Sequence, residues 1–369
     1  MGLGRFLLPA MALGPFVASH PAGELSQLDR SLPEADAISL PEIVLMDDET
    51  GDHLQTIDIS VTHTLEPTTD ATPQPQGQGS KGAAGSLPDK PHDVQPAASS
   101  MGNGTKPAPT KQFNIAYAPY RADHGCKSQD EIDNDVQHLS KYYSTLRIYG
   151  TDCDQVAKVV KAARASEMNV FAGIWDPKDI ENEIKLIQEG VDGNWGIIQF
   201  VSVGNELVNS GQATASDMAG AVAEARSRLR EAGYQGPVVT VDTFGAYQRN
   251  KELGEASDHC TINAHAYFDK EISSPDAGQW LKNTVNDVRN SCPQSKKVIV
   301  TETGWPSQGD SNGLAAPGMD EQAAAISSIR QHFAQDPSQV FFFSAFNDLW
   351  KSPGNLNTEQ YWGINNHTA

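Results

Sequence analysis

The last 258 residues of the chain alternate between short apolar runs and longer amphipathic runs, and this alternation limits the fold more than any other feature. Many of the apolar runs are apolar on both faces, as strands must be when helices cover both sides of a sheet. Strands that alternate with helices form parallel βαβ units. The predicted strands are 113–118, 144–150, 169–175, 197–206, 237–244, 260–268, 297–303 and 340–348.

Helical patterns fill the intervals, and the clearest of them, over 215–233, is expected to begin at a Ser/Asp start signal and to end at Gly233. Eight βα units in about 250 residues are typical of a (β/α)8 TIM barrel. A doubly wound sheet is the rival fold, but no glycine-rich phosphate loop follows the first run, which ends Ala118-Pro119-Tyr120. About twenty residues follow the eighth run, so the last helix should be short or absent.

The first 111 residues have a different composition. Of 27 aromatic residues, none lies between Val17 and Gln112, whereas 13 of the 22 prolines lie before position 112. Such a segment buries too little apolar surface to offset its ordering entropy. We therefore predict a barrel over 112–369 preceded by a disordered N-terminal region, which divides into a signal peptide (1–20), an acidic low-structure segment (21–66) and a Pro/Gly/Ser/Thr-rich linker (67–111).

The signal-peptide prediction rests on Arg5 and the apolar run 6–18. That run is too short and too rich in proline to span a membrane, and no other stretch approaches about 18 apolar residues. We therefore expect no membrane span and a secreted, extracellular or cell-wall protein. The glycosylation sequons at Asn103 and Asn366 are compatible with secretion.

The net charge of −20 is spread along the whole chain without a basic block. Nucleic-acid binding depends on Lys and Arg that face phosphates, so no nucleic-acid partner is expected. An acidic surface is indifferent to a neutral ligand such as a sugar. The charge therefore favours an uncharged substrate.

Glu206 and Glu302 end the fourth and seventh predicted strands, on opposite sides of the ring. Active sites of such barrels lie at the carboxyl ends of the strands. Both residues follow apolar runs, and burial raises the pKa of a carboxyl group toward the range of a general acid. Two carboxylates across a cleft can cleave a glycosidic bond. The alternative is that each merely ends a strand in solvent or in a salt bridge, which the presence of two such residues beside Asn205 and Trp305 disfavours.

The motifs VGNE (203–206) and TETGWP (301–306) resemble glycoside hydrolase family 17. YAPY, RIYGTDC, VTVDTF and FNDLWK are similar to its fungal cell-wall branch of β-1,3-glucanases and glucanosyltransferases, and the resemblance covers 113–369. It implies a retaining mechanism on a (β/α)8 barrel, with Glu206 as the acid/base and Glu302 as the nucleophile. Retention requires carboxyl groups about 5–5.5 Å apart.

Further residues at the strand ends are candidates for substrate binding. Asn205 can donate to a sugar 2-hydroxyl, which is favoured over a turn-forming role beside Glu206. Tyr149 and Tyr267 either place hydroxyls near the nucleophile or are rim aromatics, and RIYG favours Tyr149. Trp305 either offers a flat face to a pyranose or packs below the rim, and the sequence does not choose between them.

Asp242, His265 and Asn347 complete the candidate sugar-binding set. An isolated His on an apolar strand is more often a packing residue. Asp348, beside Asn347, is expected to pair with Arg147 or Lys351. The His and Cys spacings do not resemble a metal site, so neither a metal nor another cofactor is expected.

The four cysteines can be paired by barrel geometry. Cys126 and Cys153 follow the first and second strands, on the catalytic face, whereas Cys260 and Cys292 precede the sixth and seventh, on the opposite face. Pairing across the faces exceeds the Cα separation of about 4.4–6.8 Å that a disulfide allows. We predict the disulfides Cys126–Cys153 and Cys260–Cys292.

These expectations combine into a monomeric, retaining glycoside hydrolase that cleaves β-1,3-glucan polysaccharide or oligosaccharide in cell-wall remodelling. A β-1,3-glucanosyltransferase or a β-glucosidase on the same site is the alternative, because water or a sugar hydroxyl can resolve the same intermediate. A barrel glycosidase for β-1,4 or β-1,6 linkages is a second alternative. A non-catalytic glucan-binding wall protein is a remote one, since a binding module needs neither carboxylate.

Overall fold

The computed structural model describes residues 113–365 and four short strands nearer the N-terminus. These strands form two antiparallel pairs, β1(Ile38–Ser39) with β4(Ser60–Val61) and β2(Ile43–Leu45) with β3(Gln55–Ile57). The sequence did not predict them, because nothing in 21–66 has a sustained period. The predicted signal peptide, the predicted linker and both sequons lie outside the described residues.

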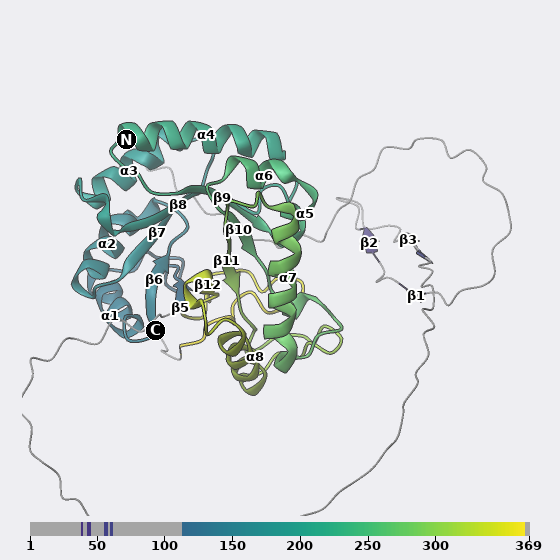
Figure 1. Ribbon diagram of the computed structural model, residues 1–369. Helices are drawn as coiled ribbons and strands as arrows, with labels where there is room; N and C mark the ends of the chain where they lie inside the picture. The colour runs from purple at the N-terminus through teal and green to yellow at the C-terminus, as the bar shows by residue number, and fades with distance from the viewer. Residues whose placement is uncertain (1–37, 40–42, 46–54, 58–59, 62–112, 366–369) are drawn as a thin grey trace, which may run out of the picture. The chain divides into compact units, whose positions relative to one another are not determined.

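Eight parallel strands close into a barrel, which confirms the predicted fold (Figure 1). They follow one another round the ring in chain order, and β12 pairs with β5 to complete it. The strands are β5(Phe113–Ala116), β6(Tyr143–Arg147), β7(Asn169–Ile174), β8(Ile198–Asn205), β9(Val238–Thr243), β10(Cys260–Asn263), β11(Val298–Thr303) and β12(Val340–Phe342). Several end earlier than the apolar runs that predicted them, so the last residues of those runs lie in loops at the barrel mouth.

The helices surround the strands (Figure 1). They are α1(Gln129–Leu139), α2(Gln155–Ala165), α3(Ile180–Val191), α4(Ala215–Glu231), α5(Phe244–Arg249), α6(Lys251–Ala256), α7(Ala277–Ser291) and α8(Met319–His332). No helix follows β12 among residues 343–365, as the short remainder of the chain predicted.

Helix α4 shows how local sequence sets the ends of an element. It begins at Ala215, the first residue of the predicted range, but the residue that caps it is Thr214. The Thr214 hydroxyl accepts from the amide of Asp217, whose carboxylate accepts in return from the amide of Thr214. Gly233, at φ +100°, follows its C-terminus as predicted.

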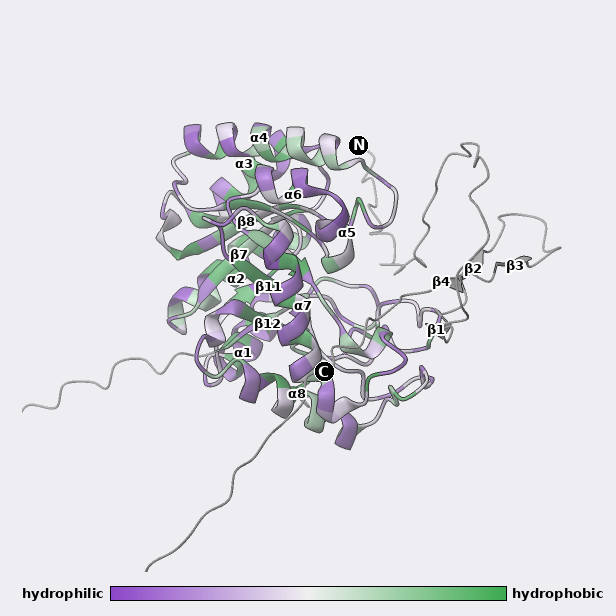
Figure 2. Ribbon diagram, turned by 45° about the vertical axis from the view of Figure 1, so that its right-hand side comes forward, coloured by the Kyte–Doolittle hydropathy of each residue, from purple (hydrophilic) through white to green (hydrophobic). Residues whose placement is uncertain are grey.

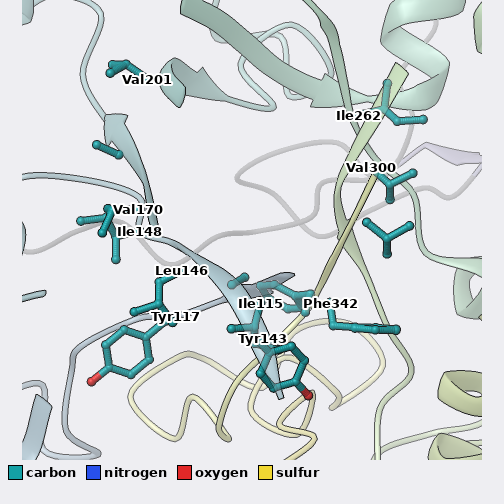
Figure 3. Packing of buried hydrophobic residues seen from close by; sticks show 14 of the residues in the cluster. Ile115, Tyr117, Tyr143, Leu146, Ile148, Val170, Val201, Ile262, Val300 and Phe342 are labelled. Carbon is teal, nitrogen blue, oxygen red and sulfur yellow. The ribbon is translucent and has the colours of Figure 1, made fainter. Parts of the chain in front are cut away.

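Two apolar layers hold the barrel together. Alternate strand residues point inward and form a central cluster that includes Phe171, Phe200 and Phe341. Their neighbours point outward and pack against the helices, and Figure 3 shows members of this outer cluster such as Ile115, Leu146 and Val300. Figure 2 shows the same division, with green strands at the centre and helices that carry purple residues. Because the interior is filled, a ligand must bind at the mouth.

Both predicted disulfides are present. Cys126–Cys153 joins the loops after β5 and β6, and Cys260–Cys292 joins the start of β10 to the end of α7. Their Cα separations are 5.5 and 6.3 Å. In the described part of the chain, no helix is both long and apolar enough to cross a membrane.

Candidate active site

Glu302 lies near the carboxyl end of β11, where three side chains from other strands and loops meet it. The Nη1 atom of Arg147 donates to its Oε1 at 2.7 Å, and the Tyr149 hydroxyl donates to the same oxygen at 2.8 Å. His265 Nε2 lies 3.6 Å from Oε2. Glu302 is only 4% exposed, so these groups replace the water that the carboxylate has lost.

These contacts fix the protonation state of Glu302. Burial acts to raise its pKa, but the Arg147 charge, the nearby His265 ring and the Tyr149 hydroxyl outweigh that effect and lower the pKa to about 2. Glu302 is therefore ionised at every physiological pH, as a nucleophile must be.

Glu206 directly follows β8, at φ +57°, and keeps part of its side chain exposed. Asn263 Nδ2 donates to its Oε1 at 2.8 Å. Burial and the nearby Glu302 charge raise the pKa of Glu206 to about 8, and the Asn263 hydrogen bond offsets only part of this rise. At neutral pH Glu206 therefore holds a proton that it can donate.

Asn205 links the two carboxyl groups through a chain of hydrogen bonds. Its Oδ1 accepts from Arg147 Nη2 at 2.8 Å and from Asn263 Nδ2 at 3.1 Å. Asn263 is itself oriented by Thr301, whose hydroxyl donates to its Oδ1 at 2.8 Å. With Oδ1 taken by two donors, the amide nitrogen of Asn205 is the group that suits a sugar hydroxyl, and this contact stays a prediction.

Asp242 supports the loop that carries Glu206. It is 1% exposed, and its carboxylate accepts from the backbone amides of Val208 at 2.9 Å, Asn209 at 3.2 Å and Thr243 at 2.8 Å. Burial raises its pKa to about 6 in spite of these amides. The contacts of Asp242 are those of a positioning residue, and its contact with a sugar stays a prediction.

Two predicted ligand contacts lie beneath the rim instead. Trp305 is completely buried, its indole N–H donates to the Ala316 carbonyl at 2.8 Å, and Tyr267 packs edge-on against it with ring centroids 5.3 Å apart. Of the two alternatives for Trp305, these contacts support packing below the rim, because no face of its ring reaches the surface. The Tyr267 hydroxyl donates to the Asp310 carbonyl, so it is Tyr149 that holds Glu302.

The remaining candidates lie after β10 and β12. His265 is placed against Glu302, within an aromatic surround that includes Phe343 and Trp362. Asn347 is exposed, and its Oδ1 accepts from the Gly363 amide at 3.0 Å. Asp348 pairs with Lys351 at 2.9 Å, which is one of the two partners expected for it.

Sequence reasoning assigned no catalytic role to Arg147 or Asn263, although both end strands of the barrel. The available signal was a charged or amide side chain directly after an apolar run. The sequence also did not reveal an aromatic pocket beside Tyr149. The walls of this pocket include Tyr120, Trp175 and Trp350. Among the described residues, no group of three or more His, Cys, Asp or Glu is placed to hold a metal ion.

Comparison with known proteins decides the family. The family model described as the BtgE/BtgC glycoside hydrolase domain matches residues 114–363, almost the whole barrel. The chain belongs to this glycoside hydrolase family. The resemblance to family 17 is confirmed, because relatives that share this glycoside hydrolase domain are named as family 17 glucosidases.

Two relatives are similar to the glycoside hydrolase domain over 252 residues, or 68% of this chain. The cell surface mannoprotein MP65 of Candida albicans is 45% identical over 65% of its own length. The probable family 17 glucosidase SCW4 of Saccharomyces cerevisiae is 43% identical over 64% of its length. The chain thus spans about 65% of these curated relatives.

Solved structures share the fold of the glycoside hydrolase domain. An active-site mutant of the Rhizomucor miehei β-1,3-glucanosyltransferase, in complex with laminaritriose, has a TM-score of 0.60 at 20% identity and covers 69% of this chain and 92% of its own. An endo-laminarinase from Formosa has a TM-score of 0.58 at 18% identity, with coverage of 69% and 83%. At these identities the likeness shows the fold alone.

Proposed function

We propose that the glycoside hydrolase domain cleaves β-1,3-glucan with retention of configuration, with Glu302 as the nucleophile and Glu206 as the acid/base. The observation that carries the proposal is the opposed ionisation of the two groups. The pKa of Glu302 is lowered to about 2 and that of Glu206 is raised to about 8, so one is a carboxylate and the other an acid over the same pH range.

In the first step, Glu206 gives its proton to the glycosidic oxygen while Glu302 attacks the anomeric carbon. The bond from that carbon to the leaving oxygen breaks as the bond to the carboxylate forms. Oε1 of Glu302 already accepts from Arg147 and Tyr149, so Oε2 is the oxygen that attacks. In the second step, Glu206 is a carboxylate and takes the proton of the incoming hydroxyl, whose oxygen bonds to the anomeric carbon as the bond from that carbon to Glu302 breaks.

The substrate assignment draws on the surroundings of the carboxylates and on the relatives. The aromatic pocket beside Tyr149 suits the apolar faces of glucose rings, and the net charge of −20 suits an uncharged polymer. The relative named as a family 17 glucosidase points to a glucosidic substrate, and the fold neighbours named as a β-1,3-glucanosyltransferase and an endo-laminarinase point to the β-1,3 linkage.

Glucanosyl transfer is the second candidate. It is favoured by the β-1,3-glucanosyltransferase among the fold neighbours, and it requires no change in the two carboxyl groups. A sugar hydroxyl then replaces water in the second step. We further propose that the protein acts outside the cell or in its wall, as the name of the cell surface mannoprotein relative suggests.

Product analysis tests these proposals. Proton NMR at early times on a laminari-oligosaccharide should show the β-anomer first, and initial release of the α-anomer would overturn the retaining mechanism. Reduced laminari-oligosaccharides separate the candidates, because products longer than the substrate mean transfer and glucose alone means exo-hydrolysis. A panel of β-1,3, β-1,4 and β-1,6 glucans tests the linkage.

Variants test the residues. Glu302→Ala should abolish turnover while saccharide binding persists, whereas the exposed Glu231→Gln on α4 should leave both unchanged. Undiminished turnover by Glu302→Ala would refute the assignment of the nucleophile. Binding without turnover in the wild-type chain would favour the non-catalytic glucan-binding alternative.

A further inference from the structure

The aromatic pocket has a wall built from two loops. The Tyr120 ring, from the loop after β5, meets the Trp350 ring, from the loop after β12, with centroids 4.9 Å apart at 61°. Both rings line the pocket together with Tyr149, whose hydroxyl is bonded to Glu302. This Tyr120–Trp350 wall therefore adjoins the carboxylate that reacts in the proposed mechanism.

Trp350 is held from its own loop. Its indole N–H donates to Asp348 Oδ1 at 3.1 Å, and Lys351 fixes the other oxygen of Asp348 at 2.9 Å. Asp348 and Lys351 are both buried, so this half of the wall has a rigid support.

Tyr120 is held from a neighbouring loop. Its hydroxyl donates to Asp152 Oδ1 at 2.8 Å and accepts from Gln155 Nε2 at 3.1 Å. Gln155 also donates to Asp152 at 2.6 Å, so the three side chains form a closed set. Asp152 and Gln155 follow β6, which means that the Tyr120 ring keeps its place only if the loops after β5 and β6 stay together.

The Cys126–Cys153 disulfide joins these same two loops. Cys126 pairs through its backbone with Tyr120, and Cys153 directly follows Asp152. Lys158 adds a second tie, because its Nζ donates to the carbonyl of Cys153 at 2.8 Å and to that of Lys127 at 3.4 Å. The covalent link is thus one residue away from the group that anchors the Tyr120 hydroxyl.

The two disulfides lie in contrasting surroundings. Cys260 and Cys292 are 0% and 6% exposed and belong to the main apolar cluster. Cys126 is exposed and Cys153 is half-buried, and neither belongs to that cluster. The Cys260–Cys292 disulfide therefore contributes to the core. The Cys126–Cys153 disulfide contributes little to it and mainly fixes the relative position of its two loops.

We propose that the Cys126–Cys153 disulfide and Asp152 are positioning groups that hold Tyr120 against Trp350 and thereby set the affinity of the pocket for a β-glucan chain. This inference rests on the proposed function, since it names the saccharide as the ligand. Releasing either positioning group leaves the Glu206 and Glu302 contacts intact and loosens only the Tyr120–Trp350 wall.

Calorimetric titration with a laminari-oligosaccharide, in a Glu302→Gln background that does not consume it, tests the proposal. C126S/C153S and Asp152→Ala should each weaken binding about two- to tenfold, the equivalent of one aromatic contact. C260S/C292S should lower the melting temperature but leave the affinity within about twofold. The exposed Asp130→Ala on α1 is the matched control and should change neither.

Equal affinity in C126S/C153S, Asp152→Ala and the parent would overturn the positioning role, as would an equal loss in C260S/C292S. Should C126S/C153S not fold, Asp152→Ala decides alone, because its disulfide is intact. A parent that binds no laminari-oligosaccharide, with a wild-type chain that cleaves none, would instead refute the proposed function and this inference together.

Discussion

Arg147 and Glu302 form a buried ion pair across the barrel mouth, with Nη1 2.7 Å from Oε1 and side chains 1% and 5% exposed. They come from β6 and β11, which two other strands separate. The second arm of the guanidinium reaches Asn205 at the end of β8. A buried pair of this kind costs much desolvation and contributes little net stability, so its value here lies in keeping Glu302 ionised and aligned.

Arg147→Met should therefore raise the pKa of Glu302 and reduce kcat/KM at least a hundredfold. It should also lower the free energy of unfolding by about 3–5 kcal/mol, because a buried charge loses its partner. The activity and stability of Arg147→Lys should lie between those of the wild type and Arg147→Met, since one ammonium group cannot bond to both Glu302 and Asn205. Activity against pH and thermal melting measure these effects, with the exposed Arg289→Met on α7 as control. An acid limb that does not move in Arg147→Met would contradict the role given to Arg147.

The pH dependence of kcat/KM should be bell-shaped, with limbs near the two pKa values, about 2 for Glu302 and about 8 for Glu206. Asn263→Ala removes a hydrogen bond that lowers the pKa of Glu206, so the alkaline limb should move to higher pH. The acid limb should remain at the same pH, because the side-chain hydrogen bonds described for Asn263 are to Asn205, Glu206 and Thr301 and none is to Glu302. An alkaline limb that moves to lower pH in Asn263→Ala would exclude Glu206 as the acid.

The barrel and the two carboxyl groups were predictable because their signals are local in the chain. Runs such as 297–303 specify strands, and a parallel barrel carries every strand end to one face. The disulfide pairs followed from the same geometry. Glu206 and Glu302 were therefore placed at the site without knowledge of any contact between them.

The roles of Trp305 and Asp242 depend on loops that no local pattern specifies. Trp305 lies two residues after the end of β11, yet its ring is buried and its indole N–H is bonded to the Ala316 carbonyl in the loop that follows. The Asp242 carboxylate accepts from backbone amides of the loop after Glu206. The path of that loop is set by tertiary packing. Polar and aromatic side chains at strand ends are recognisable in the sequence, but whether they face the ligand or the loop beneath it is not.

Glu206→Gln should make the folded protein more stable at neutral and alkaline pH, although it abolishes turnover. The folded pKa of about 8 exceeds the unfolded value of about 4.5, so the folded state binds the extra proton between these limits and loses stability as the pH rises through them. The variant lacks this loss and should gain about 1–3 kcal/mol above pH 8, less than the full shift implies because Glu206 is partly exposed. Urea unfolding at pH 4 and pH 9 measures it, and a gain that is the same at both values would contradict the assignment.

Trp305→Phe should lower stability without weakening saccharide binding, because the indole is fully buried and its N–H is bonded to the Ala316 carbonyl. The lost hydrogen bond and volume should cost about 1–3 kcal/mol, or a fall of several degrees in melting temperature. Trp350→Ala is the informative comparison, since Trp350 lines the pocket and is only partly buried. It should weaken laminari-oligosaccharide binding with a smaller effect on melting. The opposite pattern, in which Trp305→Phe weakens binding and melts as the wild type does, would restore Trp305 as a sugar platform and would require the loop over it to open.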